Sequence, residues 1–382
     1  MSRILYGVQG EGRGHATRSL RILSELAHEG HEVLVLTGGD ALPVLRSAFG
    51  DRVREIPILR FHYNSRGALC PWRTLLRNIV PWMRVNLRNV PLENELRRFR
   101  PDAAISDFEP LTCRLARILN VPLLSVNHQH FLTETVLPRL QGGWHSFKLI
   151  AYRWGTRFIS GWPRRIIVSS FHHFPKKPGS RAIFVGPFLP EEIRNLPVQE
   201  GEVVTVYLRR SQYLRFLLPM LTAFPNQPFE IFSSWPEEGN PLRVPGHIKL
   251  RSISREGFLT SLAQSRALIT TAGNQVLGEA ICLGKPVLAM PEAGVLEQDL
   301  NAAALEGSGC GMICSLRELR PETWNRFESG REGFLRGIEE FRLRHPHYDG
   351  LAATLRVIHR LVRKTYRVPG TVRRPEPLPV FS

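Results

Sequence analysis

Residues 268–280 lie where an apolar run meets a helical pattern, and this stretch says most about the fold and its ligand. They read Leu268-Ile269-Thr270-Thr271-Ala272-Gly273-Asn274-Gln275-Val276-Leu277-Gly278-Glu279-Ala280. The run ends in small residues, Asn274 can cap the next helix, and that helix places Gln275 and Glu279 on one face. Free N–H groups at a helix start suit a pyrophosphate, and a carboxylate one turn later can accept from ribose hydroxyls. The stretch, with Thr271 and Gly273 in its turn, predicts a nucleotide-phosphate site.

A second polar stretch follows this one. Residues 284–291 are typical of a short strand framed by turn residues, and Glu297, Gln298 and Asn301 come directly after them. Their side chains can hydrogen-bond the hydroxyl groups of a sugar. Each motif alone fits ordinary helix and loop chemistry, but their order and spacing together are specific. We therefore expect the segment 270–311 to bind a nucleotide-sugar.

The rest of the chain alternates short apolar runs with helical patterns. In the first half, the apolar runs are 4–8, 32–37, 103–107, 123–126, 166–168 and 183–187. A proline-rich stretch follows at 187–197. The runs after it are 203–208, 229–232, 248–250, 267–271 and 286–290. Such alternation indicates parallel sheets covered by helices on both faces. We predict an α/β protein of two facing, Rossmann-like, doubly wound domains with a ligand cleft between them. The predicted domains are 1–165 and 166–350, followed by a helix over 351–366 packing back toward the first domain and an irregular tail over 367–382.

A glycine-rich loop follows the first apolar run and precedes a helix; it reads Gly10-Glu11-Gly12-Arg13-Gly14-His15. Gly12 and Gly14 allow a tight turn and a close approach of the backbone to a ligand. A dinucleotide fingerprint would need a glycine where His15 stands, which disfavours NAD as the ligand. A structural turn without a ligand is the alternative.

His15 is a candidate general base. A histidine at a helix start beside a cleft can remove a proton near neutral pH. Asp107 leaves a strand at the same edge of the predicted sheet and could fix the tautomer of His15. Equally, Asp107 could cap the helix that follows it.

The composition is that of a globular protein with a strong positive charge. The chain has 51 Lys and Arg against 34 Asp and Glu, a net charge of +17, which favours anionic partners. Its five cysteines lack C-x-x-C spacing, which favours a reducing cytoplasm over a disulfide scaffold. Strand-like residues from position 3 argue against a signal peptide, and charges interrupt the longest candidate membrane span, 144–162. We expect a cytoplasmic protein, with peripheral membrane contact as an option.

Up to about residue 363, the chain resembles the GT-B glycosyltransferases, especially the MurG-like branch. The resemblance rests on 10–15, 106–110, 127–130, 185–187, 273–279, 284–286 and 297–302. It implies that Gly273 and Asn274 meet the diphosphate of the donor and that Glu279 holds its ribose. It further implies that Glu297 and Gln298 read the donor sugar, and that the backbone of Ser252 and Ile253 faces uracil.

Two places depart from this family pattern. Val276 stands where MurG-like enzymes carry a small hydroxyl residue, so one phosphate contact is in doubt. The glycine-rich turn expected after the first strand of the second domain reads Tyr207-Leu208-Arg209-Arg210-Ser211. Arg209 or Arg210 could clamp a phosphate there, or could be a solvated surface arginine.

No Asp-x-Asp lies at a strand end and no His/carboxylate set has clear metal-ligand spacing, so we expect no metal and no cofactor. The helix dipole and arginine would then stabilise the leaving group, and the family resemblance implies inversion at the anomeric carbon. The predicted activity moves a hexose or N-acetylhexosamine from a UDP-sugar, as co-substrate, to a hydroxyl acceptor.

The acceptor side of the sequence is less specific. His128 and His130 follow a strand end and could line an acceptor pocket, although core histidines are as common. The aromatic and basic stretches 67–90 and 144–165 could touch an anionic membrane, which would favour a lipid-linked or cell-envelope acceptor. Solvated basic helix faces are the alternative.

Two rival functions remain at this point. A nucleotide-sugar epimerase or hydrolase of the same architecture would convert the donor without an acceptor. A basic nucleic-acid-binding protein would fit the charge, but no finger, RRM or KH signature is present and the basic residues are scattered.

Overall fold

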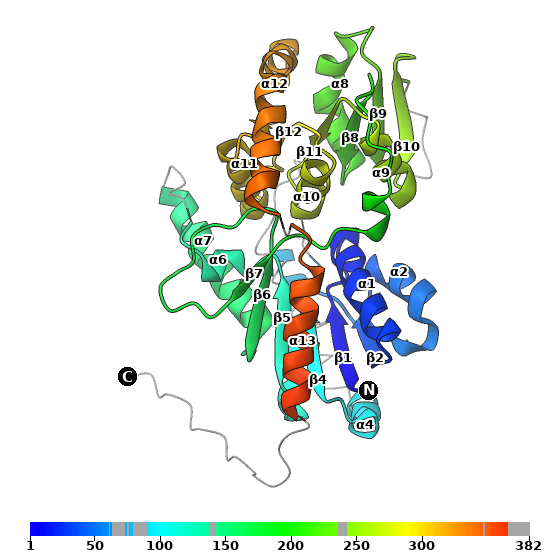
Figure 1. Cartoon of the computed structure of the whole chain (residues 1–382), viewed down its shortest axis with the longest axis vertical. Helices are drawn as coiled ribbons and strands as arrows, with labels where there is room; N and C mark the ends of the chain where they lie inside the picture. Colours follow the sequence, from blue (N-terminus) through cyan, green and yellow to red (C-terminus); the bar gives the residue numbers. More distant parts are fainter. Residues whose placement is uncertain are drawn as a thin grey trace.

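The computed structural model consists of two α/β domains stacked end to end (Figure 1). It describes residues 1–60, 62, 73–74, 76–78, 90–137, 143–235, 243–346 and 348–365. The irregular tail expected over 367–382 and most of the basic, aromatic stretch 67–90 lie outside these residues. Of the helices among the described residues, none is both long enough and apolar enough to cross a membrane.

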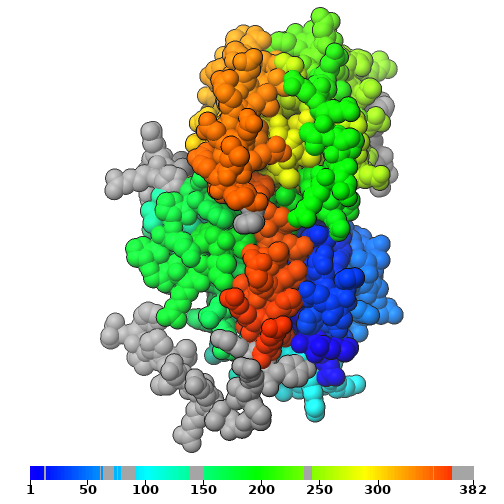
Figure 2. Space-filling model, viewed as in Figure 1, coloured from blue at the N-terminus to red at the C-terminus, as the bar shows by residue number. Residues whose placement is uncertain are grey.

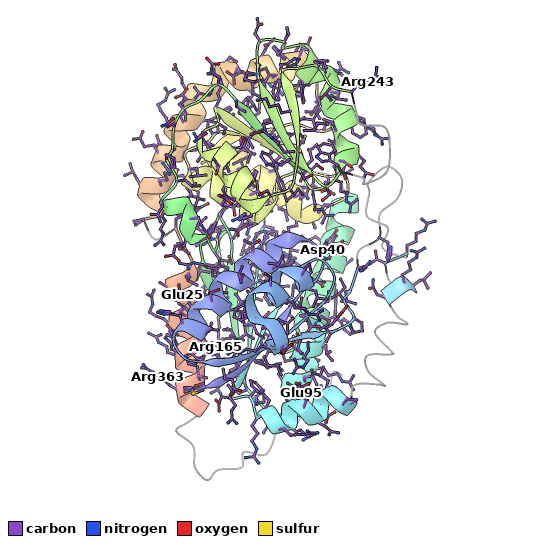
Figure 3. All side chains as sticks on the ribbon, turned by 90° about the vertical axis from the view of Figure 1, so that its right-hand side faces the viewer. Glu25, Asp40, Glu95, Arg165, Arg243 and Arg363 are labelled. Atoms are coloured by element: carbon purple, nitrogen blue, oxygen red, sulfur yellow. The ribbon has the colours of Figure 1, made fainter. Side chains whose placement is uncertain are left out.

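The first domain is built on a seven-stranded parallel sheet of order β3-β2-β1-β4-β5-β6-β7. Its strands are β1 (Arg3–Val8), β2 (Glu32–Thr37), β3 (Val53–Glu55), β4 (Ala103–Asp107), β5 (Leu123–Asn127), β6 (Arg165–Ser169) and β7 (Ile183–Val185). Its helices are α1 (Arg13–His28), α2 (Ala41–Phe49), α4 (Val90–Phe99), α5 (Pro110–Ile118), α6 (Phe131–Glu134) and α7 (Gly143–Ser160), with a 3-10 turn η1 (Gly50–Arg52). In Figure 3, α1 and α2 lie on the side of this domain that faces the viewer.

The second domain has a six-stranded parallel sheet of order β10-β9-β8-β11-β12-β13. Its strands are β8 (Val204–Leu208), β9 (Phe229–Ser233), β10 (Ile248–Ser252), β11 (Ala267–Thr270), β12 (Val287–Ala289) and β13 (Gly311–Ile313). Its helices are α8 (Leu214–Thr222), α9 (Arg255–Ala263), α10 (Asn274–Cys282), α11 (Leu296–Gly307) and α12 (Pro321–Arg344), with 3-10 turns η2 (Glu191–Arg194), in the linker, and η3 (Ser211–Tyr213). The two doubly wound sheets confirm the predicted fold class.

Burial explains why the strands are apolar along their length. All five residues of β4 and of β5 are buried, as a sheet covered on both faces requires. Each domain has apolar clusters on both faces of its sheet: the first domain on either side of β1, the second on either side of β11. The strand-end residues are thereby held on a rigid scaffold.

The domain boundary expected between residues 165 and 166 was placed too early. β6 pairs with β5, and β7 pairs with β6, so the first sheet continues to Val185. The proline-rich stretch that begins at residue 187 then leads to the second domain. A short apolar strand has the same sequence pattern in either sheet, so the pattern did not reveal which sheet β6 and β7 join.

The last described helix, α13 (Leu351–Thr365), returns to the first domain as expected. Leu351, Ile358, Leu361 and Val362 pack in the same core cluster as β1 residues such as Ile4. Figure 2 shows this helix, in orange-red, lying between the blue N-terminal segment and the green β6–β7 segment.

The chain therefore crosses between the domains twice, at neighbouring points. A Cβ atom on Gly186 would lie 1.5 Å from the carbonyl oxygen of Tyr348, and one on Gly350 would lie 2.3 Å from that of Gly186. Only glycine permits so close a passage of the outgoing and returning segments.

Candidate functional site

The first part of the site forms where β1 and β4 end side by side. Val8 pairs with Asp107 in the parallel register, so the loop after β1 and the end of β4 reach the same edge of the sheet. Gly12 is the N-terminal capping residue of α1 and has a φ of 80°, which glycine adopts without strain. Added Cβ atoms on Gly12 or Gly14 would meet nothing within 4 Å, so the loop leaves open space at the helix start.

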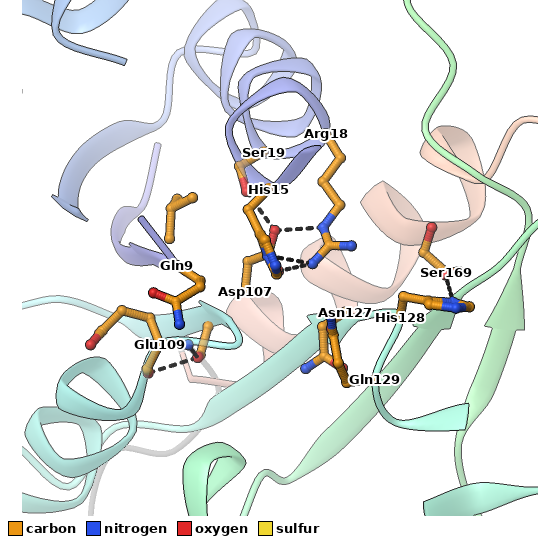
Figure 4. Close-up of polar contacts among 12 residues, drawn as sticks. Gln9, His15, Arg18, Ser19, Asp107, Glu109, Asn127, His128, Gln129 and Ser169 are labelled. Atoms are coloured by element: carbon orange, nitrogen blue, oxygen red, sulfur yellow. Dashed lines mark hydrogen bonds and ion pairs between the residues drawn. The ribbon is translucent and has the colours of Figure 1, made fainter. Parts of the chain in front are cut away.

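Asp107 is the polar centre of this edge. Its carboxylate lies 2.9 Å from Nδ1 of His15, accepts from Nε of Arg18 at 2.6 Å and accepts from the hydroxyl of Ser19 at 2.9 Å. A second guanidinium nitrogen of Arg18 also donates to it. His15, Arg18 and Ser19 all come from the first turns of α1 and converge on one buried aspartate (Figure 4).

The alternative role of Asp107, as a helix cap, is wrong because Glu109 has that role. Its carboxylate accepts from the backbone N–H groups of Leu111 at 2.8 Å and Thr112 at 2.6 Å, at the start of α5. Asp107 is thus left to the residues of α1.

The charge state of Asp107 follows from its neighbours. Burial alone would raise its pKa, but the positive charge of Arg18 and the contact with His15 lower that pKa to about 2. Burial likewise opposes the charge on Arg18, and the carboxylate of Asp107 outweighs it and raises the pKa of Arg18. The aspartate is therefore an ionised acceptor at neutral pH.

The tautomer of His15 decides what its second nitrogen can do. A protonated Nδ1 donates to Asp107, and this leaves the lone pair of Nε2 available to accept a proton. Nη2 of Arg18 also lies 2.7 Å from Nδ1, so an unprotonated Nδ1 would accept from Arg18 instead. His15 can therefore act as a base through Nε2 only in the tautomer in which Nδ1 carries the proton and donates to Asp107.

The second part of the site lies at the carboxyl edge of the second sheet. Arg209 follows β8, Ser252 ends β10 and is exposed, Ile253 comes next, and Thr271 follows β11. Because parallel strands end at one edge, the residues predicted to bind the donor are gathered there. Gly273 is the N-terminal capping residue of α10.

Asn274 does not cap α10 as expected. No side-chain capping bond is present, and the side chain of Asn274 instead crosses to the first domain. Its Oδ1 accepts from the backbone N–H of Phe171 at 3.0 Å, and its Nδ2 lies 3.4 Å from the carbonyl oxygen of Ser169 at the end of β6. The residue joins the carboxyl edges of the two sheets.

Glu279 is fully buried, and both of its oxygens are engaged. Arg255, from the start of α9, donates to them at 2.7 and 3.2 Å, and Gln275 donates to one at 2.8 Å. The Arg255 side chain is 39% exposed, so the pair extends from the core toward solvent. No motif in the sequence singled out Arg255, although it follows the predicted Ser252–Ile253 strand end by two residues.

A second buried carboxylate, also missed, supports Arg209. Glu292 is fully buried after β12, and its Oε1 lies 3.4 Å from Nε of Arg209. It also accepts from the hydroxyl of Tyr213 at 3.1 Å, and burial together with this carboxylate raises the pKa of Tyr213 to about 12. The side-chain oxygen of Gln298 accepts from the backbone N–H of Glu292 at 2.7 Å.

The start of α11 meets the first domain directly. Nε2 of His128 lies 3.0 Å from Oδ1 of Asn301 and 3.8 Å from Oε1 of Glu297. Gln129 approaches Glu297 at 3.3 Å. Burial is the largest influence on His128 and lowers its pKa despite Glu297, so this contact holds a neutral imidazole.

His130 lies deeper in the first domain. Its Nε2 is 2.8 Å from the hydroxyl of Ser125, and burial lowers its pKa to about 4. Both histidines are buried. An acceptor role for either of them stays a prediction.

One group of His and carboxylate side chains with metal-ligand spacing occurs among the described residues, away from these edges. Glu29, His31 and His359 place their ligand atoms within 4.8 Å of one another where α1 ends against α13. Nε2 of His359 lies 2.6 Å from Glu29, an ion pair that accounts for the contact when the histidine is protonated. The group is separated from His15 by most of the length of α1, roughly 20 Å.

The chain is similar to known glycosyltransferases in sequence and in fold. Residues 2–329 match the sequence profile of the family described as glycosyl transferase family 1. An uncharacterised glycosyltransferase of Methanosarcina acetivorans is 25% identical over 330 residues, covering 82% of this chain and 86% of the relative. Among solved structures, the kitacinnamycin glycosyltransferase aligns with this chain at a TM-score of 0.65 and 15% identity. The alignment covers 94% of this chain and 99% of that structure's chain. Acinetobacter baumannii MurG has a TM-score of 0.59 at 15% identity, covering 94% and 100%.

Proposed function

The chain belongs to glycosyl transferase family 1 and is a glycosyltransferase with the GT-B fold, and we propose that it moves a hexose or N-acetylhexosamine from a UDP-sugar to a hydroxyl acceptor with inversion. The observation that carries this proposal is the 2.9 Å contact of His15 with the buried, ionised Asp107. A histidine oriented in this way has the chemistry of a general base.

The proposed step balances as a single displacement. Nε2 of His15 takes the proton of the acceptor hydroxyl while that oxygen bonds to the anomeric carbon of the donor. The bond from the anomeric carbon to the diphosphate oxygen breaks, and the nucleoside diphosphate leaves with the electron pair. Asp107 stabilises the imidazolium that forms, as an ionised carboxylate on Nδ1 does in general. Attack opposite the leaving group inverts the anomeric carbon.

Protein cations would stabilise the diphosphate as it leaves, without a metal. Arg255 and Arg209 are each partly exposed, at 39% and 37%, and each is held by a fully buried glutamate. They flank the carboxyl edge to which the start of α10 also belongs. Pre-oriented guanidinium groups and helix N–H groups stabilise charge that develops on a leaving oxygen. We assign the donor phosphates to this edge on that basis.

Calorimetry and turnover assays together test the proposal. We expect UDP-sugars to bind more tightly than GDP- or dTDP-sugars in a calorimetric panel. His15→Ala should leave donor affinity unchanged and reduce transfer roughly 10²- to 10⁴-fold, the usual share of a general base. His28→Ala, at the exposed end of the same helix, is the matched control and should remain active.

Product analysis separates transfer from its rival. An epimerase or hydrolase would convert the UDP-sugar with no acceptor present. A full rate of donor conversion without acceptor, or a fully active His15→Ala variant, would overturn the proposed reaction.

A further inference from the structure

Helix α7 has one face in the protein and one in solvent. Thr156 and Ser160 are buried, and Tyr152 is partly buried and places its hydroxyl 3.4 Å from the carbonyl oxygen of Gly294 in the second domain. The helix packs on α5 and α6 at the side of the first domain (Figure 1). These contacts fix which stripe of the helix points outward.

The outward stripe is apolar. Ile150, Trp154 and Phe158 are 54%, 69% and 68% exposed, and Trp162, just after the helix, is 83% exposed. Side chains four apart lie on one face of an α-helix, so the first three form a continuous row. We call these four residues the α7 stripe.

Such a row is unusual for a surface. Ten large apolar side chains are exposed among the residues that the structure describes, and four of them fall within these thirteen positions. Scattered exposed apolar residues need no explanation, but a contiguous patch marks an interaction site. Two of the four are tryptophans, the residue type enriched where a membrane meets water.

Cations border the stripe. Arg157, Arg164 and Arg165 are exposed, and the guanidinium of Arg117 lies 5.8 Å from the ring centroid of Trp162. Arg153 donates a hydrogen bond to the carbonyl oxygen of Leu132, and Lys177 donates one to the carbonyl oxygen of Thr133.

Three of these cations, Arg153, Arg157 and Lys177, also repel one another. Burial is the main cause that lowers the pKa of Lys177, and the nearby charges of Arg153 and Arg157 lower it further. The pKa of Arg153 is lowered by burial and by Arg157. One carboxylate, Glu134, faces Lys177 and partly offsets this. The border therefore keeps an excess of positive charge that an external anion would relieve.

We propose that the α7 stripe inserts into the interfacial layer of a bilayer that contains anionic phospholipid, with the bordering arginines on the lipid phosphates. An apolar face with tryptophan beside arginine is the arrangement of helices that lie in a membrane interface. Each basic residue near an anionic surface adds to the attraction, and salt weakens it. The proposal does not depend on which sugar or acceptor the enzyme uses.

Vesicle co-sedimentation of the full chain tests the surface. We expect binding to vesicles of phosphatidylcholine with phosphatidylglycerol, weaker binding to phosphatidylcholine alone, and loss of the difference at high salt. The double variant Trp154→Glu/Phe158→Glu should bind at least about tenfold more weakly, because two anchors become anionic. Leu343→Glu is the matched control, since Leu343 is 78% exposed on α12 and outside the stripe.

A charge variant and a mass measurement complete the test. Arg157→Glu should reduce the preference for anionic vesicles while the stripe itself remains. Light scattering without lipid should give one mass for wild type and the double variant. Equal sedimentation of all variants, or a wild-type dimer that the double variant abolishes, would overturn the proposal, the latter in favour of a second copy on this face.

Donor calorimetry on the same variants separates this proposal from the proposed reaction. The stripe lies outside the donor residues, so UDP-sugar affinity should be unchanged in the double variant. Loss of vesicle binding with intact donor binding supports the stripe. Failure of UDP-sugars to bind wild type would contradict only the proposed donor.

Discussion

The two sheet edges each present a carboxylate, but they use it in different ways. At the first edge, Asp107 is a strand-end residue whose partners His15, Arg18 and Ser19 come from one helix of its own domain. At the second, Glu279 lies one turn inside α10 and holds Arg255, which reaches toward solvent. The first carboxylate is surrounded by its partners, and the second holds a cation in place. In the proposed reaction, the first edge would therefore serve proton transfer and the second would hold the anionic donor phosphates, although both follow the same strand–turn–helix pattern.

The largest expected effect comes from changing the carboxylate at the first edge. Asp107→Asn should lower turnover roughly 10²- to 10⁴-fold, because an amide no longer holds His15 in the base-competent tautomer. Donor affinity should not change, since Asp107 lies outside the second edge. Asp102→Asn is the control for kcat and for calorimetry, because Asp102 directly precedes β4 whereas Asp107 ends it. Equal activity of the two variants would remove the first edge from the chemistry.

The next effect concerns folding rather than turnover. Arg18→Met leaves Asp107 buried without its cation, and we expect the free energy of unfolding to fall by about 3–5 kcal/mol. Arg21→Met is the control, because the pairs of Arg21 with Glu25 and Glu191 are partly exposed and are worth about 0–1 kcal/mol. Urea unfolding measures both. Similar losses in the two variants would show that Asp107 does not depend on Arg18.

The pH dependence of stability tests the same buried ion pair of Asp107 with Arg18. The pKa of Asp107 is about 2 in the folded protein against an ordinary 3.8. Because this pKa is lowered by folding, the ionised carboxylate of Asp107 stabilises the folded protein above about pH 4. This contribution, about 2 kcal/mol of the free energy of unfolding, is lost as the pH falls toward about 2. Urea unfolding of wild type at pH values from 5 down to 2 should show this loss, and the Asp107→Asn variant should lack that part of the slope. If wild type and Asp107→Asn lose stability in parallel as the pH falls, Asp107 does not have a lowered pKa in the folded protein.

The smallest expected effect tests the second edge. Glu279→Ala and Arg255→Ala should each weaken UDP binding about tenfold, ~1.4 kcal/mol. The double variant should be little worse than either, because the two residues act as one unit. Glu256→Ala, exposed on the same helix start as Arg255, is the calorimetric control. Unchanged UDP affinity in Glu279→Ala would remove the donor from this edge.

The sequence was sufficient to predict which residues share an edge. Parallel strands end together, so Asp107 and the loop after β1 could be placed side by side from the order of the runs. Arg209, Ser252 and Thr271 also follow strands of one parallel sheet, but the prediction for Ser252 came from the family resemblance. The doubly wound architecture also followed from periodicity, whereas periodicity alone does not say that the last helix packs on the first domain.

The partners of the buried charges could not be predicted in the same way. Arg18 and Arg255 each lie in a helical pattern where arginine is common, and nothing local distinguishes a buried arginine from a solvated one. Glu292 had no signal because its environment is assembled from three separate elements. Asn274 matched the capping pattern, but its side chain is used between the domains.

The return of α13 to the first domain has a consequence for how the protein is made. The first sheet ends at Val185, yet the core around Ile4 is closed by α13 residues from Leu351 to Val362. At about 5–20 residues per second, a ribosome would need roughly ten to thirty seconds to pass from the one to the other. During that interval the first half of the chain waits with an apolar face uncovered while the second half is completed. The part synthesised first is therefore the last to close, and its open face is where nascent chains would need protection from one another.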